Sequence, residues 1–135
     1  MRARVDWRRA ENRGRRAESL CALVLALKGY RIVARRYRCP AGEVDIIARR
    51  GGALVAVEVK ARADTGLAAE SLGARQRARV ERAALHFLAG SGAGIVPHSP
   101  DSLRFDVMLV APWRWPCHIA DAWRPDSGAR GLGSW

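Results

Sequence analysis

Long apolar runs and paired cysteines are both missing from this sequence. The longest apolar run, Leu20 to Leu27, is far too short to span a membrane, and the opening residues MRARVDWRRA lack the apolar stretch of a secretory signal. The three cysteines, Cys21, Cys39 and Cys117, are an odd number without paired spacing, which argues against a disulfide framework and a zinc knuckle. We therefore expect a cytoplasmic protein that makes no membrane contact.

Acidic residues are scarce relative to basic ones. The chain has 24 Lys and Arg against 13 Asp and Glu, which gives a formal net charge of +11 and a sequence pI near 11.2. Such a charge predicts a polyanionic partner, because clustered arginines neutralise phosphates and release counterions. Nucleic acid, and DNA in particular, is the obvious candidate, although a coding bias toward arginine would give the same composition.

Lysine is nearly absent, since Lys28 and Lys60 are the only basic residues besides histidine that are not arginine. An ammonium group is a compact point charge, whereas a guanidinium group is a planar fork, so the two are not interchangeable. A chain that prefers arginine so strongly has kept an amine at Lys60. That choice becomes informative only together with the acidic residues near it in the sequence.

Internal repeats and the glycine pattern of a phosphate-binding loop are also missing from the chain. At 135 residues, the chain can bury one hydrophobic core but not two. We expect a single domain over residues 1–125. The last stretch, DSGARGLGSW, lacks periodicity, so a disordered tail is expected over residues 126–135.

The apolar spacing that is present predicts an α/β fold with a mixed sheet. Helices are expected over residues 15–28 and 71–88, where apolar residues recur at helical spacing. Strands are expected over residues 30–37, twice within 42–60, and over 103–110, where apolar and polar residues alternate. The order is therefore helix, three strands, helix and strand.

Three tryptophans lie in the segment that follows the last of these strands. Residues 112–123 are expected to form a short strand or a flap over the sheet. Trp113, Trp115 and Trp123 are expected to be hydrophobic cover for a small core. Stacking on nucleic-acid bases is the alternative role.

The stretch GEVDIIARRGGALVAVEVK, residues 42–60, predicts a hairpin with charged residues on one face. A two-residue glycine turn in its middle would pair Asp45 with Glu58 and Glu43 with Lys60, all on the same face. The opposite face, expected to be the core, would carry Val44, Ile46, Val55, Val57 and Val59. A loop longer by one residue would reverse every side chain of one strand.

Two neighbouring carboxylates on this face need a physical reason. Asp45 and Glu58 would repel each other and would be costly to desolvate unless a cation lay between them. Mg²⁺ prefers oxygen ligands, which it takes from one or two carboxylates and from water or phosphate. A solvated strand face, with Lys60 neutralising a carboxylate, is the alternative. Leu54 and Ala56 would lie on the same face of the second strand as Glu58. The beginning of that face is therefore apolar and not solvated, which favours the metal site.

Several short motifs together resemble the YraN-like family of small bacterial proteins. They are GRRAE at residues 14–18, GEVD at 42–45, VEVK at 57–60, an arginine-rich helix after these, and RFDV at 104–107. The resemblance spans roughly residues 10–123. That family is similar to the restriction-endonuclease-like superfamily, whose PD-(D/E)XK signature also occurs in archaeal Holliday-junction resolvases. Valine precedes the aspartate here, where the signature has proline.

The resemblance implies a restriction-endonuclease-like core, in which a helix, three antiparallel strands, a second helix and a further strand follow one another. It also implies a divalent metal ion, Mg²⁺ or Mn²⁺. The metal ligands would be the carboxylates of Asp45 and Glu58 and the main-chain carbonyl of Val59. Nothing in the composition or spacing alone assigns that set.

The same resemblance implies roles for three further polar residues. Lys60 would orient the attacking water or stabilise charge on the phosphate. Glu18, in the first helix, would be an auxiliary acidic residue. Gln76, on the inward face of the second helix, matches a position that is often polar or basic in such nucleases.

The leading hypothesis is metal-dependent hydrolysis of phosphodiester bonds in DNA, with branched structures as a candidate substrate. A four-way junction would favour a homodimer, because the cutting of such a junction is symmetric. The arginines expected to position the nucleic-acid backbone are Arg15, Arg16, Arg62, Arg75 and Arg79. A solvated surface is the alternative for each of them.

Two other functional classes stay open at this point. A non-catalytic nucleic-acid-binding module that keeps the nuclease fold predicts salt-sensitive binding without cleavage in any metal. A protein-interaction subunit predicts binding that ignores salt and is lost when Trp113 and Trp115 are replaced.

Overall fold

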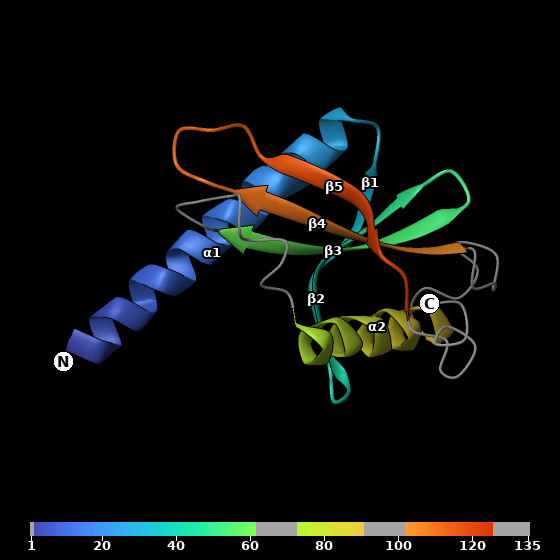
Figure 1. The fold of residues 1–135 in the computed structure, drawn as a ribbon, viewed down its shortest axis with the longest axis horizontal. Helices are drawn as coiled ribbons and strands as arrows, with labels where there is room; N and C mark the ends of the chain where they lie inside the picture. Colours follow the sequence, from blue (N-terminus) through green and yellow to red (C-terminus); the bar gives the residue numbers. More distant parts are fainter. Residues whose placement is uncertain (1, 62–72, 91–101, 126–135) are drawn as a thin grey trace.

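The helices and strands follow one another in the predicted order, with one strand added at the end (Figure 1). The computed structural model describes residues 2–61, 73–90 and 102–125, and within these the side chains from residue 14 onward. The elements are α1 (Arg2–Leu27), β1 (Arg31–Cys39), β2 (Gly42–Arg50), β3 (Ala53–Ala61), α2 (Ala74–Ala89), β4 (Leu103–Val110) and β5 (Cys117–Trp123). α1 begins well before the predicted residue 15, and β5 shows that the last segment is a strand and not a flap.

Two predictions, the disordered tail and the role of Arg62, concern residues that the structure does not describe. The tail over residues 126–135 lies outside the described residues, as does Arg62. Within residues 2–61, 73–90 and 102–125, no helix combines the length and the apolar character needed to cross a membrane.

The described strands form one five-stranded mixed sheet in the order β1-β2-β3-β4-β5. β3 and β4 run parallel, and every other neighbouring pair is antiparallel. A parallel pair requires a crossover connection, and α2 lies in the chain between β3 and β4. The predicted α/β class and mixed sheet are confirmed.

Each face of the sheet packs against a different helix. Leu54 and Ala56 of β3 belong to the hydrophobic cluster that α2 covers. Val55 and Val57 of the same strand belong to the cluster that α1 covers. β3 is therefore apolar on both sides, as is typical of strands in parallel pairs, and the hairpin has a core on each face and not on its valine face alone.

The hairpin between β2 and β3 has the predicted register, and its last recorded pair is Ile46 opposite Val57. The inward and outward alternation along β2 breaks near that pair, because Ile46 packs under α1 while Val44 and Ile47 both pack under α2. Figure 1 shows the start of β2 bending away from β3 toward α2. The prediction that Val44 shares a face with Ile46 is therefore wrong, and Asp45 lies between them at the bend.

Gly42, at the start of β2, lets this strand approach α2 closely. A Cβ atom at this position would clash with the main-chain carbonyl of Arg79 in α2. Glycine is needed here for the absence of a side chain. Gln76 lies about one helical turn before Arg79, so the same contact sets the position of Gln76 over the sheet.

Replacing Gly42 by alanine should therefore destabilise the fold and displace α2. We expect the free energy of unfolding to fall by about 1–3 kcal/mol, the usual cost of overpacking. Gly52→Ala is the matched control, because a Cβ there meets no atom within 4 Å. Its effect should stay within about 0.5 kcal/mol. Urea denaturation of both variants measures the difference, and equal midpoints would contradict the tight contact.

Candidate functional site

Asp45 lies at the bend of β2, and its carboxylate bonds the main chain of the neighbouring strand. Oδ2 of Asp45 accepts a hydrogen bond of 2.8 Å from the backbone N–H of Val59 in β3. That N–H lies beyond the last recorded backbone pair of the hairpin. The side chain therefore satisfies a donor that the departing strand leaves unpaired, and this bond holds the carboxylate between the two strands.

Glu58 is a buried carboxyl group beside Asp45. It is only 6% exposed, and Nε2 of Gln76 lies 3.4 Å from its Oε2 as a donor. Burial raises the pKa of Glu58 to about 9, helped by a hydrogen bond and the charge of Asp45 and opposed by Lys60 and Gln76. Glu58 therefore keeps its proton at neutral pH, and its contact with Asp45 supports the sequence prediction that the two side chains meet.

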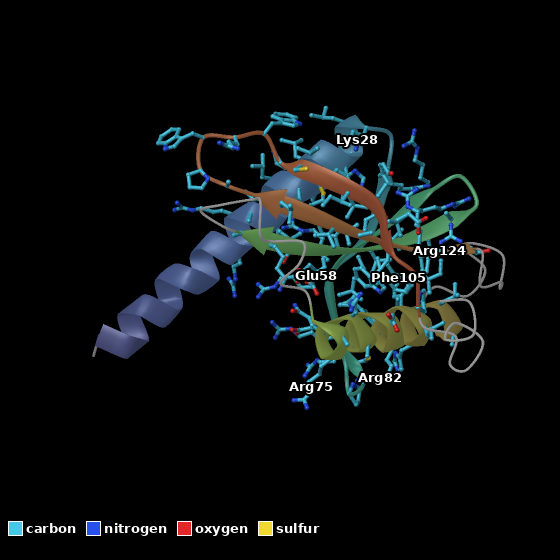
Figure 2. The ribbon with its side chains drawn as sticks, viewed as in Figure 1. Lys28, Glu58, Arg75, Arg82, Phe105 and Arg124 are labelled. Carbon is cyan, nitrogen blue, oxygen red and sulfur yellow. The ribbon has the colours of Figure 1, made fainter. Side chains whose placement is uncertain are left out.

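Lys60 and Gln76 form a second part of the same cluster. Nζ of Lys60 donates a hydrogen bond of 3.0 Å to Oε1 of Gln76. The amide of Gln76 thus joins the lysine to Glu58. Figure 2 shows Glu58 between β3 and α2, whereas Arg75 and Arg82 point away from the sheet on the far side of α2. Gln76 lies on the inward side of α2, as predicted.

Glu18 brings a third carboxylate to this part of the molecule from α1. It is buried, and it forms ion pairs with Arg35 at 3.4 Å and Arg36 at 3.8 Å. Burial raises its pKa, and the charge of Asp45 adds to that effect while the two arginines oppose it. Its Oε1 is a buried oxygen without a hydrogen-bond partner. Such an atom is costly unless another ligand satisfies it.

A pocket of about 200 Å³ opens beside Glu18 and Asp45. Its lining also includes Val59 and the arginines Arg15 and Arg36. Arg36 has a left-handed backbone, with φ of 54°, which is uncommon for a residue with a long side chain. Arg36 was not predicted as a site residue, although it belongs to an Arg-Arg pair near the end of the first predicted strand.

The remaining predicted residues lie farther from the carboxylates or point elsewhere. Glu43 does not pair with Lys60 in the recorded ladder, and it forms an exposed ion pair with Arg38 at 3.5 Å. The predicted arginines that the structure describes are all exposed, on α1 or α2; they are Arg15, Arg16, Arg75 and Arg79.

A second polar cluster, around Asp106 in β4, was missed by the sequence analysis. Asp106 is fully buried and accepts hydrogen bonds from Arg104 at 2.7 and 2.9 Å, from His118 at 2.7 Å and from the N–H of Asp121 at 2.9 Å. Burial alone would raise the pKa of Asp106, but the donors lower it to about 2. Both carboxylate oxygens of Asp106 accept hydrogen bonds. Two of the donor residues, His118 and Asp121, belong to β5, so the cluster holds β5 against β4. The sequence signal for this cluster was Arg104, a basic residue two positions before Asp106 on the same face of the strand.

Of the three tryptophans that follow β4 in the described residues, one is buried and two are exposed. Trp123 is 9% exposed, stacks on Phe105 with 5.2 Å between ring centroids, and donates from Nε1 to Glu81 at 2.8 Å. Its predicted role as hydrophobic cover is confirmed. Trp113 is fully exposed and Trp115 is 71% exposed, so the same prediction is wrong for both of them.

The fold and the site together define the class of protein. It is a small, basic α/β protein with a cluster of carboxylates and one lysine at the place where two strands of a mixed sheet separate. The chain belongs to the uncharacterised protein family UPF0102, whose family model matches residues 17–110. The membership of the YraN-like family that the motifs predicted is thereby confirmed.

Similar proteins carry the same family name in several bacteria. A UPF0102 protein of Parvibaculum lavamentivorans is 58% identical over 113 residues, covering 83% of this chain and 81% of the relative. One of Maricaulis maris is 48% identical over 125 residues, with 93% and 95% covered. One of Paramagnetospirillum magneticum is 50% identical over 125 residues, with 87% and 91% covered. The matched residues 17–110 contain the whole carboxylate cluster, whereas the two exposed tryptophans lie beyond them.

Replacing Glu58 by glutamine should stabilise the protein at alkaline pH. Between pH 4.5 and about 9 the native state holds the Glu58 proton that the unfolded chain releases, so stability falls as pH rises through this window. Glutamine does not titrate, and the variant escapes this loss. We expect its free energy of unfolding to exceed that of the parent by roughly 1–3 kcal/mol near pH 9, the usual penalty for an uncompensated buried group.

Thermal unfolding at several pH values measures this difference. The excess stability should shrink toward zero as the pH falls to 4.5. Glu43→Gln is the matched control, since its exposed side chain makes only a surface ion pair of little energetic value. A stability difference between Glu58→Gln and the parent that does not change with pH would contradict the raised pKa of Glu58.

Proposed function

We propose that this protein is a metal-dependent phosphodiesterase that hydrolyses DNA, with a restriction-endonuclease-like core. The observation that carries the proposal is the meeting of the Asp45 carboxylate with the buried carboxyl group of Glu58 on a chain of net charge +11. A basic protein without a use for this pair would gain stability by losing it. Functional sites are where such costs are usually retained.

The residues present fit a hard divalent ion. Asp45 and Glu58 supply carboxylate oxygens and Val59 supplies a main-chain carbonyl, and Mg²⁺ or Mn²⁺ commonly takes only one or two carboxylates from a protein. No group of three or more His, Cys, Asp or Glu side chains suited to a metal occurs in the described part of the chain, so water and phosphate would complete the ligand set. Oε1 of Glu18, which lies 3.4 Å from Arg35 but accepts no hydrogen bond, offers a further acceptor nearby.

An ion held there would supply Lewis-acid chemistry, polarising the phosphate and acidifying a water. The protein's own residues then do the positioning. Gln76 holds the ammonium group of Lys60 at 3.0 Å and contacts Glu58, so the lysine is oriented next to the carboxylates. Lys60 orients the attacking water or stabilises the charge that develops on the phosphate.

Arginines on both helices support nucleic acid as the substrate. Arg15 lines the pocket beside Asp45, and Arg16 follows it on α1. Arg75 and Arg79 flank Gln76 on the exposed side of α2. Arg15 can therefore contact a phosphate backbone at the pocket, whereas Arg75, which points away from the sheet, can contact only a part of the substrate that extends beyond α2. A branched substrate cut symmetrically would be served by a homodimer.

The element order adds support for the restriction-endonuclease-like core. α1, the three antiparallel strands β1 to β3, the crossover helix α2 and the parallel strand β4 follow one another as that core requires. The carboxylates and lysine lie on β2 and β3, as the resemblance implied. A non-catalytic module that keeps this fold remains the rival, and it differs in predicting binding without turnover.

Cleavage assays with purified protein test the proposal. Branched, flapped and linear DNA are incubated with Mg²⁺ or Mn²⁺, and products are separated by electrophoresis. Asp45→Asn, Glu58→Gln and Lys60→Ala should each lower the cleavage rate by about 100-fold or more, as expected for groups that stabilise the transition state. EDTA should abolish cleavage in the parent protein.

Matched controls come from the chain itself. Lys28→Ala removes the other lysine, whose Nζ contacts Nδ1 of His118 away from the carboxylates. Asp121→Asn removes a carboxylate that pairs with Arg124. Both variants should cleave like the parent. Cleavage that survives undiminished in the three site variants would reveal a contaminant, and DNA binding without cleavage in either metal would favour the non-catalytic module.

A further inference from the structure

The loop that joins β4 to β5 presents two tryptophans to solvent on a constrained backbone. Its sequence is Ala-Pro-Trp-Arg-Trp-Pro, residues 111–116. Ala111 and Pro116 are buried and anchor its ends, while Trp113, Arg114 and Trp115 are exposed. The N–H of Arg114 donates to the carbonyl of Ala111 at 3.4 Å, which closes a turn.

The backbone of this loop carries a cost that packing does not explain. Trp113 has φ of 63°, a left-handed conformation that is unfavourable for a bulky side chain, and its ring is fully exposed. Prolines at both ends restrict the loop further. The result is a pair of aromatic rings held out from the surface by a loop with little conformational freedom to lose on binding.

The loop lies at the same end of the sheet as the lysine of the carboxylate cluster. β3 and β4 are parallel, with Lys60 opposite Leu109 and Ala61 opposite Val110. The loop begins directly after Val110, and Figure 1 shows it beyond the arrowheads of β3 and β4. A nucleic acid strand that passes the carboxylates can therefore continue onto the tryptophans.

The chemistry of the loop favours nucleic acid as its occupant. Arg114 lies between the two tryptophans in the sequence, no acidic residue lies within residues 111–116, and the whole chain has a net charge of +11. Interleaved aromatic and basic side chains combine base stacking with phosphate attraction. Bases within a duplex already stack on their neighbours, so free faces are offered by unpaired nucleotides.

We propose that Trp113 and Trp115 form a stacking site for unpaired nucleobases, which makes single-stranded or branched nucleic acid the substrate class of this protein. The inference rests on the proposed function for its link to cleavage. The binding itself depends only on the loop, so it can be measured where no hydrolysis occurs.

Fluorescence anisotropy of a labelled oligothymidine, in EDTA and with the full chain, tests the stacking site. Trp113→Ala and Trp115→Ala should each weaken binding by about tenfold, the scale of one base stacked on one aromatic ring. Binding of a blunt duplex of equal length should change by less than about twofold, because phosphate contacts persist. Trp115→Phe should restore most of the affinity, since a smaller ring still stacks.

Two control variants separate stacking from other effects. Leu85→Ala removes an exposed apolar side chain on α2 and should leave oligothymidine binding unchanged. Arg114→Ala should weaken single-strand and duplex binding together and lower the salt slope by about one. Circular dichroism shows whether each variant is folded, and Trp115→Ala carries the test if the strained position 113 does not tolerate change.

Three outcomes would overturn the stacking site. They are equal losses for oligothymidine and duplex, unchanged oligothymidine binding in both tryptophan variants, and a dimer in sedimentation that these variants dissociate without loss of oligothymidine affinity. The last would make the loop a protein interface. Loss of stacking in the tryptophan variants of a protein that never cleaves DNA would instead refute the nuclease proposal and leave the stacking site standing.

Discussion

The hydrogen bond from the Val59 N–H to the Asp45 carboxylate is the contact on which the arrangement of the site depends. It forms where β2 bends toward α2 and leaves a main-chain donor of β3 without a strand partner. Gly42 permits the bend because a side chain there would clash with α2. Because this main-chain donor needs a partner, the Asp45 carboxylate is held between two strands, where its charge acts on both Glu58 and Glu18.

Much of the fold follows from local sequence patterns. Helical spacing before Gly29, the glycine turn of the hairpin and the alternation in residues 103–110 each predicted an element that the structure contains. The bend of β2 could not be predicted, because strand parity assumes a straight ladder while the bend depends on the approach of α2 to Gly42, far away in sequence. The same assumption misplaced Val44.

Members of the candidate site could be predicted where one hairpin register brings reactive side chains together. They could not be predicted where a side chain meets its partner from an element distant in the sequence. Asp45, Glu58 and Lys60 were found because a hairpin register relates them, and Gln76 because of the family resemblance. Arg36 and the Asp106 cluster were missed, since their partners lie on other elements: Glu18 on α1 and His118 on β5. The exposed tryptophans contradict the average behaviour of large aromatic residues, which composition alone expects to be buried.

Scarce lysine, abundant arginine and the meeting of Asp45 with the buried Glu58 support the proposed function, in which a phosphate backbone reaches an ion held by Asp45, Glu58 and Val59. Anomalous diffraction from crystals of the protein soaked in Mn²⁺ tests that claim most directly. The account predicts a peak within ligand distance of both carboxylates and the Val59 carbonyl. A saturating soak in which manganese binds only elsewhere, and the two carboxyl groups stay bonded to each other, would contradict it.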